Sequence, residues 1–217
     1  AKALGKTGNI PEAISVYTRA IELQPNYAEA YLNRGLGYMD LQRFSESLKD
    51  LNTSIGLNEN LSEAYFARAY LNSFHNEYGN AIDDYTKYIS LIPNDARGYV
   101  NRGNARGLND DPLGAIDDFT TAIELDPNNI NAFISRGTDK AILGDYEGAI
   151  EDFTSAIKLD NSTVQYYFMR GEAKFMMEDF KGASADYRVM IQRNPKDGKA
   201  YYFKGLAELN MKNKTKG

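Results

Sequence analysis

The sequence predicts an all-α fold, a right-handed superhelical solenoid of antiparallel helix pairs. The first observation is a 34-residue period: YVNRG at Tyr99–Gly103 recurs as FISRG at Phe133–Gly137 and as YFMRG at Tyr167–Gly171. The second is that the later part of the period repeats too, since AIDDFTTAIELDP from Ala115 matches AIEDFTSAIKLDN from Ala149. A fixed period of this length indicates a solenoid, in which each repeat packs only against its neighbours.

The period divides the chain into one partial repeat, five full repeats and a final helix, all in a single solenoid domain. The predicted ranges are 1–27 for the partial repeat, 28–61, 62–95, 96–129, 130–163 and 164–197 for the full repeats, and 198–217 for the final helix and tail. Each full repeat should hold a first and a second helix of about 14 residues. Ala1–Thr7 is expected to end a helix, so a fragment or processed form of a longer protein is expected. Asp111-Pro112 predicts an N-cap followed by the first helical residue.

One position in the first helices is always small. It is occupied by Gly35, Ala69, Gly103, Gly137, Gly171 and Gly205. Glycine inside a helix costs roughly 1 kcal/mol relative to alanine, and Ala69 shows that a positive φ is not required. The position therefore predicts a close approach of two helices. Large residues of the second helices are expected to face the small ones: Tyr17, Leu51, Tyr85, Phe119, Phe153 and Tyr187.

These residues resemble the tetratricopeptide repeat (TPR) family. The family pattern has an aromatic residue, Leu-Gly, Tyr, Ala, an aromatic residue and Pro over 34 positions. The matching residues in the repeat 96–129 are Tyr99, Arg102-Gly103, Arg106, Ala115, Phe119 and Pro127. Arginine stands where the family often has leucine, and Glu59 and Asn161 replace the proline. The resemblance implies a helical-pair solenoid with a concave groove that binds extended peptides.

The arginine of each first helix precedes an aspartate of the second helix by a constant spacing. The pairs are Arg34 and Asp50, Arg68 and Asp84, Arg102 and Asp118, Arg136 and Asp152, and Arg170 and Asp186. The spacing predicts one solvent-exposed ion pair in each repeat, contributing only ~0–1 kcal/mol. The alternative is a row of arginines that captures an acidic ligand.

Several classes of function are not supported by the composition. A net charge of −5 leaves no broad basic surface for a nucleic-acid backbone. The sequence has no cysteine, hence no disulfide and no thiolate metal site, and this fits the cytoplasm better than a periplasmic or secreted location without deciding it. No apolar run of about 18 residues predicts a membrane span. No metal and no cofactor are predicted.

Catalysis is not predicted either. His75 is the single histidine, and a surface or loop histidine is a better interpretation than a base or ligand. Doublets such as Asp117-Asp118 do not face one another on a helix. No phosphate loop, nucleophile elbow or zinc spacing is present, so the sequence predicts a protein that is not an enzyme.

The stripe of the first helices that faces away from the second helices is the candidate binding surface. At about 100° per residue, Tyr99 and Gly103 face the partner helix, and Asn101 and Asn104 lie on the opposite stripe. In the TPR family this stripe lines the concave groove. The resulting peptide-binding candidates are Asn33, Leu36, Tyr70, Phe74, Arg97, Asn101, Asn104, Asn131, Thr138, Phe168, Met169, Glu172, Tyr202, Phe203 and Leu206.

This stripe is polar at its centre and apolar at its C-terminal end. Asn33 and Asn101 match groove asparagines that hold a ligand backbone in some TPR proteins. The carboxylate clamp of chaperone-binding TPR proteins is incomplete, because Val100 stands where a lysine is needed, one turn before Asn104. The apolar end is expected to bind a foreign peptide or, alternatively, to be covered by a further C-terminal segment or a second copy of the chain.

The favoured function is a non-catalytic scaffold that binds an extended segment of another protein in the groove. Two alternatives stay open: the regulatory or substrate-docking domain of a larger enzyme, and a self-assembling structural protein that forms a homo-oligomer through its apolar end.

Overall fold

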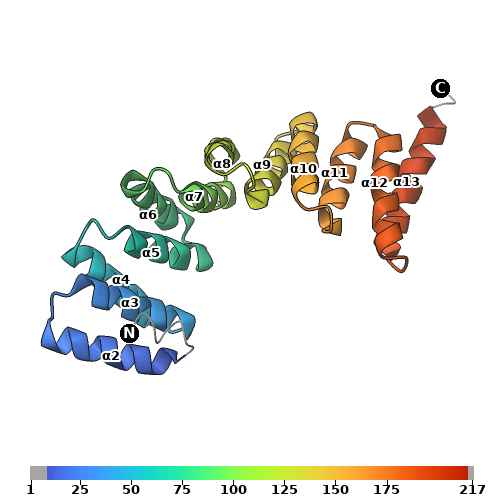
Figure 1. Ribbon diagram of the computed structural model, residues 1–217. Helices are drawn as coiled ribbons and strands as arrows, with labels where there is room; N and C mark the ends of the chain where they lie inside the picture. The colour runs from blue at the N-terminus through green and yellow to red at the C-terminus, as the bar shows by residue number, and fades with distance from the viewer. Residues whose placement is uncertain (1–8, 215–217) are drawn as a thin grey trace. The chain divides into compact units, whose positions relative to one another are not determined.

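The computed structural model describes residues 9–214, and the described part is all helical with no β-strand (Figure 1). The helices are α2 (Ile10–Leu23), α3 (Ala28–Asp40), α4 (Phe44–Leu57), α5 (Ser62–Phe74), α6 (Tyr78–Leu91), α7 (Ala96–Leu108), α8 (Pro112–Leu125), α9 (Ile130–Ile142), α10 (Tyr146–Leu159), α11 (Val164–Met176), α12 (Phe180–Arg193) and α13 (Gly198–Lys214). The all-α prediction of sequential helix pairs is confirmed. The helix end expected within Ala1–Thr7 and the last residues of the predicted tail lie outside the described residues.

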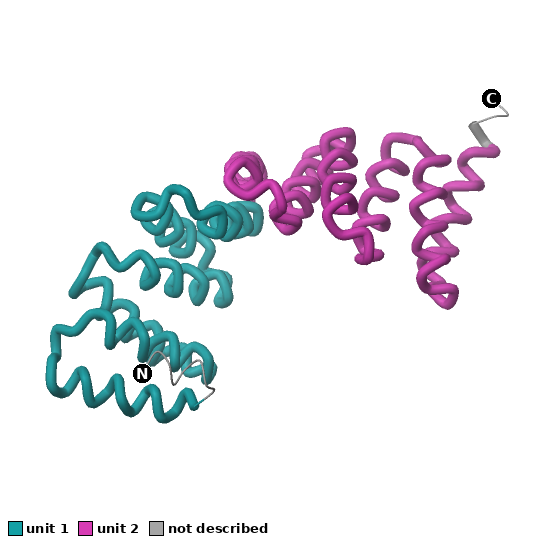
Figure 2. Tube along the Cα trace, viewed as in Figure 1, with its two compact units in different colours: residues 1–109 teal, residues 110–217 magenta. Residues whose placement is uncertain are grey.

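The chain forms two compact units, residues 1–109 and 110–217, called unit 1 and unit 2 (Figure 2). In unit 1 the helices α2 to α7 pack in sequence, and the first helix α5 also contacts the first helices α3 and α7. In unit 2 the helices α8 to α13 pack in the same sequential manner. The single solenoid domain over 1–217 and its right-handed superhelix stay predictions.

Two residues after the end of each of the first helices α3, α5, α7, α9 and α11, the backbone enters the left-handed region. These residues are Gln42 (φ 58°), Asn76 (φ 63°), Asp110 (φ 60°), Gly144 (φ 85°) and Glu178 (φ 60°). At Gly144 the backbone N–H donates to the Ala141 carbonyl at 3.1 Å, and the Asp145 N–H donates to the Lys140 carbonyl at 2.9 Å. This bond pattern is that of a Schellman motif, which closes the helix and fixes the turn into the next one.

The second helices of unit 2 begin with aspartate N-caps. Asp111 Oδ1 accepts from the backbone N–H of Gly114 at 3.0 Å, and Asp145 Oδ1 accepts from that of Gly148 at 2.9 Å. The N-cap predicted at Asp111-Pro112 is therefore confirmed. A Cβ on Gly148 would lie 2.4 Å from Oδ2 of Asp145, so this glycine makes room for the cap.

The small position of the first helices allows close contact with the second helices. A Cβ added to Gly137 would lie 2.8 Å from Cε1 of Phe153, and one added to Gly171 would lie 2.8 Å from Cε1 of Tyr187. The predicted packing of a large residue against the small position is therefore confirmed at Gly137 and Gly171. Gly205 differs, because a Cβ there would meet nothing within 4 Å.

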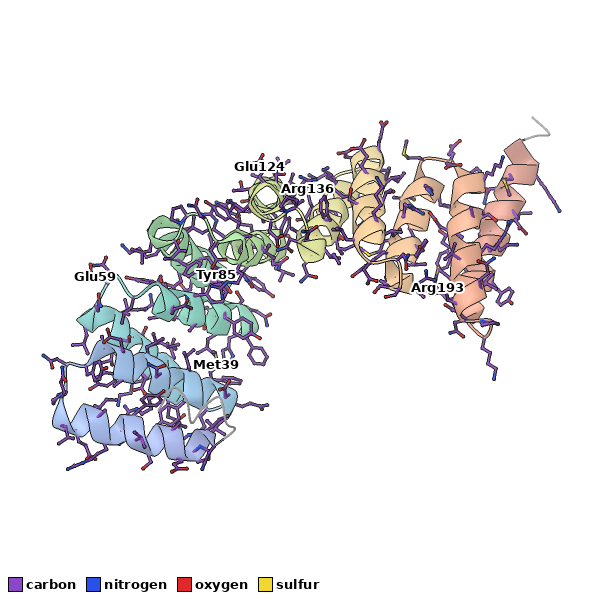
Figure 3. The ribbon with its side chains drawn as sticks, viewed as in Figure 1. Met39, Glu59, Tyr85, Glu124, Arg136 and Arg193 are labelled. Atoms are coloured by element: carbon purple, nitrogen blue, oxygen red, sulfur yellow. The ribbon has the colours of Figure 1, made fainter. Side chains whose placement is uncertain are left out.

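Four of the predicted arginine–aspartate pairs are present, each with two hydrogen bonds. In the pair of Arg136, which Figure 3 labels, Nε lies 3.0 Å from Asp152 Oδ2 and Nη2 lies 2.6 Å from Oδ1. The other described pairs are Arg34–Asp50, Arg68–Asp84 and Arg170–Asp186. The expected solvent exposure was wrong, because the four aspartate side chains are only 3–8% exposed. The pair Arg102–Asp118 would join the two units and stays a prediction.

Each of these arginines also reaches the preceding second helix. Arg136 Nη1 donates to Thr120 Oγ1 at 3.0 Å, and Arg68 Nη1 donates to Asn52 Oδ1 at 2.6 Å. The corresponding acceptors for the others are Thr18 for Arg34, Thr86 for Arg102 and Thr154 for Arg170. A side chain that bridges three helices is structural, and these bonds favour the ion-pair interpretation over capture of an acidic ligand.

Candidate functional site

Two apolar pockets flank α11 in unit 2. The α9–α11 pocket, of about 270 Å³, is lined by Thr138, Ala141, Ile142, Tyr146, Phe153, Met169, Glu172, Ala173 and Met176. The α11–α13 pocket, also of about 270 Å³, is lined by Glu172, Phe175, Met176, Tyr187, Phe203 and Leu206. Glu172 and Met176 belong to both. The pockets therefore adjoin along α11, on the stripe that the sequence analysis predicted as the binding surface.

Several predicted stripe residues line these pockets, and others do not. Thr138, Met169 and Glu172 line the first pocket; Glu172, Phe203 and Leu206 line the second. Asn131, at the start of α9, and Tyr202 are exposed and line neither pocket. The ring of Tyr202 lies edge-on to that of Phe203, with centroids 5.4 Å apart.

Phe168 is placed differently from the expectation. It was predicted to line the groove, but only 5% of it is exposed, and it packs in the core between α11, α12 and α13. Its ring centroid lies 5.2 Å from that of Phe203, and the Lys199 ammonium lies 3.8 Å from its centroid. Phe168 therefore packs against Phe203 within the core and exposes almost no surface to a ligand. Because neighbouring residues of a helix point about 100° apart, Phe168 faces the core while Met169 lines the pocket.

The two groove asparagines are partly engaged by their own helices. The Asn33 amide donates to the Glu29 carbonyl at 2.6 Å, and the Asn101 amide donates to the Arg97 carbonyl at 2.8 Å. Each amide has a second N–H hydrogen and a carbonyl oxygen besides this bond. The Thr138 hydroxyl likewise donates to the Ile134 carbonyl at 2.8 Å. Asn104 is exposed.

The apolar candidates of unit 1 are spread over different surroundings. Leu36 packs against the buried core of the unit, whereas Tyr70 and Phe74 are both more than half exposed. The Phe74 ring lies 5.1 Å from Phe44 and 5.4 Å from His75 between centroids. His75 is the C-cap residue of α5 and is exposed beside these two rings, which agrees with its interpretation as a surface residue.

Arg97 is held by a local network. Its guanidinium donates to Asp95 Oδ2 from Nη2 at 2.6 Å and from Nε at 2.9 Å, and the Tyr88 hydroxyl donates to the same oxygen at 2.5 Å. Hydrogen bonds from Arg97 lower the pKa of Asp95 to about 2. Burial, together with Asp95, raises the pKa of Tyr88 to about 12. This network fixes the start of α7, and Arg97 is already engaged by a carboxylate.

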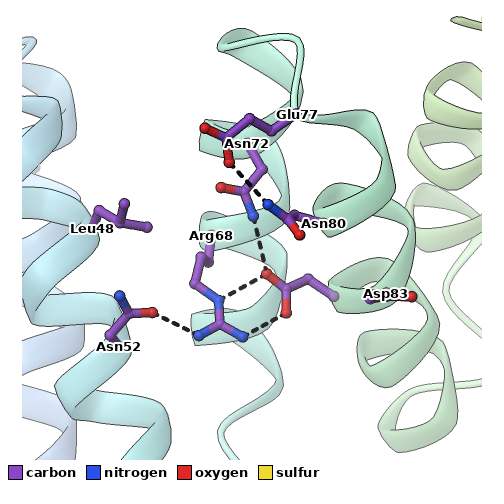
Figure 4. Close-up of a pocket in the computed structure, with 8 residues that line it drawn as sticks. Leu48, Asn52, Arg68, Asn72, Glu77, Asn80 and Asp83 are labelled. Carbon is purple, nitrogen blue, oxygen red and sulfur yellow. Dashed lines mark hydrogen bonds and ion pairs between the residues drawn. The ribbon is translucent and has the colours of Figure 1, made fainter. Parts of the chain in front are cut away.

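A polar pocket of about 350 Å³ lies in unit 1 where α4, α5 and α6 meet (Figure 4). It is lined by Leu48, Asn52, Arg68, Asn72, Glu77, Asn80, Asp83 and Asp84. Asn72 occupies the position that is Lys140 and Lys174 in later repeats. Lys140 Nζ lies 2.9 Å from Asp152, whereas the Asn72 amide lies 3.4 Å from Asp84. The pocket thus opens where a shorter side chain replaces a lysine.

The α11–α13 pocket contains two polar groups. Burial of its carboxyl group raises the pKa of Glu172, and the nearby Lys199 ammonium opposes this rise. Burial raises the pKa of the Tyr187 phenol far above its ordinary value, and the negative charge of Glu172 adds to the rise. The Tyr187 hydroxyl has no hydrogen-bond partner among the described residues.

The described residues contain no group of three or more histidine, aspartate or glutamate side chains placed to hold a metal ion. Within the same residues, no helix combines the length and apolar character needed to cross a membrane.

Sequence reasoning missed the pocket residues that the second helices contribute. Phe153 and Tyr187 were interpreted as packing residues, and Tyr146 was assigned no role. Phe175 of the first helix α11 was assigned no role either. Comparing Tyr187 with the residues at the same position of other repeats could have identified it. The tyrosine at the same position, Tyr85, has Ser73 one helix earlier, and the residue corresponding to Ser73 in the later repeat is Phe175.

Comparisons with known proteins agree with this architecture. A model described as "Tetratricopeptide repeat" matches residues 28–61, 62–95 and 141–163, and one described as "TPR repeat" matches residues 1–41, so that more than half of the chain is covered. No match was found among curated proteins.

Solved structures share the fold at low sequence identity. YrrB, "a TPR protein with an unusual peptide-binding site", has a TM-score of 0.78 and 19% identity over 87% of this chain and 97% of its own. A TPR protein from Parabacteroides merdae has a TM-score of 0.73 and 18% identity over 99% and 85%. MamA from Desulfovibrio magneticus has 0.70 and 20% over 75% and 92%. With repeat models covering more than half of the sequence and the fold shared with these structures, the chain belongs to the tetratricopeptide repeat family.

Proposed function

We propose that this protein is a non-catalytic scaffold that binds an extended segment of another protein along the exposed stripe of its first helices. Tetratricopeptide repeat proteins are protein-interaction scaffolds, and the family is generally non-catalytic. The observation that carries the proposal is the pair of adjoining apolar pockets on either side of α11. YrrB, whose fold is similar, is described as having a peptide-binding site, which favours the same class of ligand.

The pockets suit the side chains of an extended chain. Each has a volume of about 270 Å³, just below the roughly 300–1,000 Å³ of small-molecule sites, so each suits one large side chain. Alternate residues of an extended segment point to the same side, which lets one segment place side chains in both pockets. Exposed Met176 lies between them and adapts to different shapes, because its thioether side chain is flexible.

Most of the affinity should come from these pockets. Burying a large apolar side chain contributes ~1.5–3 kcal/mol, whereas a net hydrogen bond contributes ~0.5–1.5 kcal/mol. Asn33 and Asn101 already donate one N–H to their own helices, so each has less to offer a ligand backbone. Unit 1 is therefore expected to add specificity, through Asn101 and its neighbours, and unit 2 to add the larger share of binding energy.

The experiment is a pull-down from the source cell, followed by titration of a peptide mapped within the captured protein. Met176→Ala and Phe203→Ala should weaken binding about tenfold or more, and Asn101→Ala less. Tyr201→Ala is the matched control, because Tyr201 is 52% exposed on α13, close to the 57% of Met176, and lines neither pocket. Met176→Ala is the decisive variant, since Phe203 also packs in the core.

Unchanged binding by Met176→Ala and Phe203→Ala would contradict the proposal. The contradiction would be strongest if substitutions of exposed residues outside the stripe abolished binding. A concentration series in light scattering tests the self-assembly alternative. If the protein forms a dimer that Met176→Ala dissociates, a second copy of the chain and not a foreign segment occupies the pockets.

A further inference from the structure

We infer that the polar pocket of unit 1 is a binding site for a primary ammonium group on an apolar stem, which takes the place beside Asp84 that lysine side chains fill in later repeats. The inference does not depend on the proposed function, because no residue of the predicted stripe lines this pocket. It is carried by comparing one repeat with two others of the same chain.

The later repeats show an ammonium group bound at the equivalent carboxylate. Lys140 Nζ lies 2.9 Å from Asp152 Oδ2, and Lys174 Nζ lies 2.8 Å from Asp186 Oδ2. In both repeats the same oxygen also accepts from the Nε of an arginine at 3.0 Å. The two lysine side chains are only 19% and 18% exposed, so each repeat holds its ammonium in a largely shielded place.

The repeat 62–95 has the carboxylate without the ammonium. Arg68 binds Asp84 with the same two bonds, from Nε to Oδ2 at 2.8 Å and from Nη2 to Oδ1 at 2.6 Å. Asn72 stands at the position of the lysine, and its amide reaches Asp84 Oδ2 only at 3.4 Å, a long and weak bond. Asp84 Oδ2 therefore accepts one strong bond where its counterparts in the later repeats accept two.

Asn72 contributes a second acceptor. The residue is only 8% exposed and lines the pocket, and its one side-chain hydrogen bond uses the amide nitrogen (Figure 4). Among the described residues, the unpartnered side-chain oxygens that are sealed from solvent belong to Ser73 and Tyr187. The Asn72 oxygen is not one of them, so a donor from outside can reach it. An ammonium has three donors and can bond to this oxygen and to Asp84 together.

The charges around the pocket favour a cation. Its lining includes the carboxylates of Glu77, Asp83 and Asp84 against a single guanidinium, that of Arg68. The remaining Nη1 of Arg68 donates to Asn52 Oδ1 at 2.6 Å, so this guanidinium is committed to the protein. The net negative charge attracts a cation and repels an anion. No three carboxylates of the described residues are placed to hold a metal ion, which leaves an organic cation.

A second pocket adjoins the polar one and suits the stem of the ligand. It has a volume of about 480 Å³ and shares Leu48, Asn72 and Glu77 with the polar pocket, while Phe44 and Leu71 add apolar surface. A hydrocarbon stem that carries an ammonium lies along apolar surface while its charged end reaches polar groups. The ligand class is therefore a primary alkylammonium, as in a lysine side chain of another protein or in a free diamine.

The test compares Nα-acetyl-lysine amide with Nα-acetyl-norleucine amide, which has the same hydrocarbon stem and no ammonium. Each is titrated into the full chain at low salt, and the side-chain amide NMR signals of Asn72 and Asn80 report binding in the pocket. We expect the lysine compound to bind with a Kd on the order of 1 mM and the norleucine compound at least about tenfold more weakly. Added salt should weaken the binding of the lysine compound, because it screens the carboxylates.

Unit 2 provides a control in the same sample. Gly148 and Glu151 stand at the positions of Asn80 and Asp83 two repeats later, where Lys140 already fills the place beside the carboxylate. Their backbone amide signals should not shift at concentrations of the lysine compound that shift the signals of the polar pocket. Equal shifts in both units would overturn the inference, because they would show a cation that gathers anywhere on an acidic protein.

Two variants test the role of individual residues. Asn72→Lys supplies the ammonium from the chain itself and should abolish binding of the lysine compound. Asp83→Asn leaves the buried ion pair of Asp84 in place and should weaken binding about twofold or more, because Asp83 is exposed and lines the pocket. Asp117→Asn is the matched control, since Asp117 is exposed at the same position one repeat later and does not line the pocket.

Unchanged binding by a folded Asn72→Lys protein would overturn the inference, as would equal binding of the lysine and norleucine compounds. If Asn72→Lys does not fold, the comparison of Asp83→Asn with Asp117→Asn decides, and equal effects of these two substitutions would overturn it.

A further arm of the titration identifies the carrier of the ammonium group. Cadaverine has the stem and the ammonium of lysine, with a second ammonium in place of the peptide groups. Tighter binding of cadaverine than of the lysine compound supports a free diamine as the ligand, and equal or weaker binding supports a lysine side chain of a partner. Binding of neither amine would overturn the inference and leave the proposed function, which Met176→Ala tests, standing.

Discussion

Arg68 and Asp84 form an ion pair with two hydrogen bonds, Nε to Oδ2 at 2.8 Å and Nη2 to Oδ1 at 2.6 Å, and the Asp84 side chain is only 8% exposed. The next bond to Asp84 comes from the neutral amide of Asn72 at 3.4 Å. The corresponding Asp152 has two cations, Arg136 and Lys140, the latter at 2.9 Å. The same buried carboxylate is therefore neutralised once in one repeat and twice in another.

We expect Arg68→Ala to destabilise the protein more than Arg136→Ala. Removing one partner of a buried ion pair costs about 3–5 kcal/mol, because the remaining charge stays buried without compensation. In Arg136→Ala the Lys140 ammonium still faces Asp152. Urea unfolding of both variants measures the difference. Arg19→Ala is the control, since its pair with Glu22 is exposed and should contribute only ~0–1 kcal/mol. Equal losses in the two buried pairs would contradict the role given to Lys140.

Asn72→Lys should stabilise the protein. The new ammonium would reach Asp84 as Lys140 reaches Asp152, and its stem would fill part of the polar pocket (Figure 4). We expect a gain on the order of 1 kcal/mol in the free energy of unfolding, reduced by salt.

Asn72→Met is the matched control for this variant, because methionine fills the space without a charge. If both substitutions change the melting temperature equally, filling of the pocket and not the ion pair is responsible. If Asn72→Lys destabilises the protein, the pocket does not accept a lysine.

Gly137→Leu should cost about 1–3 kcal/mol through overpacking, because even a Cβ there would lie 2.8 Å from the Phe153 ring. Gly205→Leu occupies the same position of the repeat but meets nothing within 4 Å, so it should be neutral or stabilise α13 by up to about 1 kcal/mol. Thermal unfolding of both variants checks this. Gly148→Leu is a poor control, because it would disturb the Asp145 N-cap. Similar losses at Gly137 and Gly205 would remove the basis of the small position.

The repeat period made most of the fold predictable. Recurring glycines, large apolar residues and arginine–aspartate spacings report contacts within a repeat, and these contacts were found at Gly137, Gly171 and Arg136. Burial of the ion pairs was missed, because spacing identifies partners but not the helices that cover them. The bond from Arg136 to Thr120 was missed for a similar reason, since it joins one repeat to the preceding one.

The candidate site was less predictable. The predicted stripe contains Met169 and Glu172, which line a pocket, but it also contains Phe168, which is buried in the core. Neighbouring residues of a helix point about 100° apart, so an error of one residue replaces a groove residue with a core residue. Pocket residues such as Tyr187 come from the second helix, and their exposure depends on the size of the residues around them. Hydrogen bonds of Asn33 and Asn101 to their own helices are likewise not visible in a pattern of residue types.

Glu172→Gln should stabilise the free protein at pH 7, by less than about 1 kcal/mol because the residue is exposed and solvent screens its charge. Burial raises the pKa of Glu172 above its ordinary value of 4.5, so the native state binds this proton more tightly than the unfolded state. The stability that the protonated carboxyl allows is present below pH 4.5 and is lost as the pH rises through the raised pKa. The gain from glutamine should therefore be largest at pH 7 and vanish near pH 4.

Glu208→Gln on α13 is the control with the opposite sign, because the Lys204 ammonium lowers the pKa of Glu208 and this substitution should destabilise the protein at pH 7. Urea unfolding of both variants at pH 4 and pH 7 decides the matter, and a gain from Glu172→Gln that is the same at both values would show that ionisation of Glu172 is not its cause.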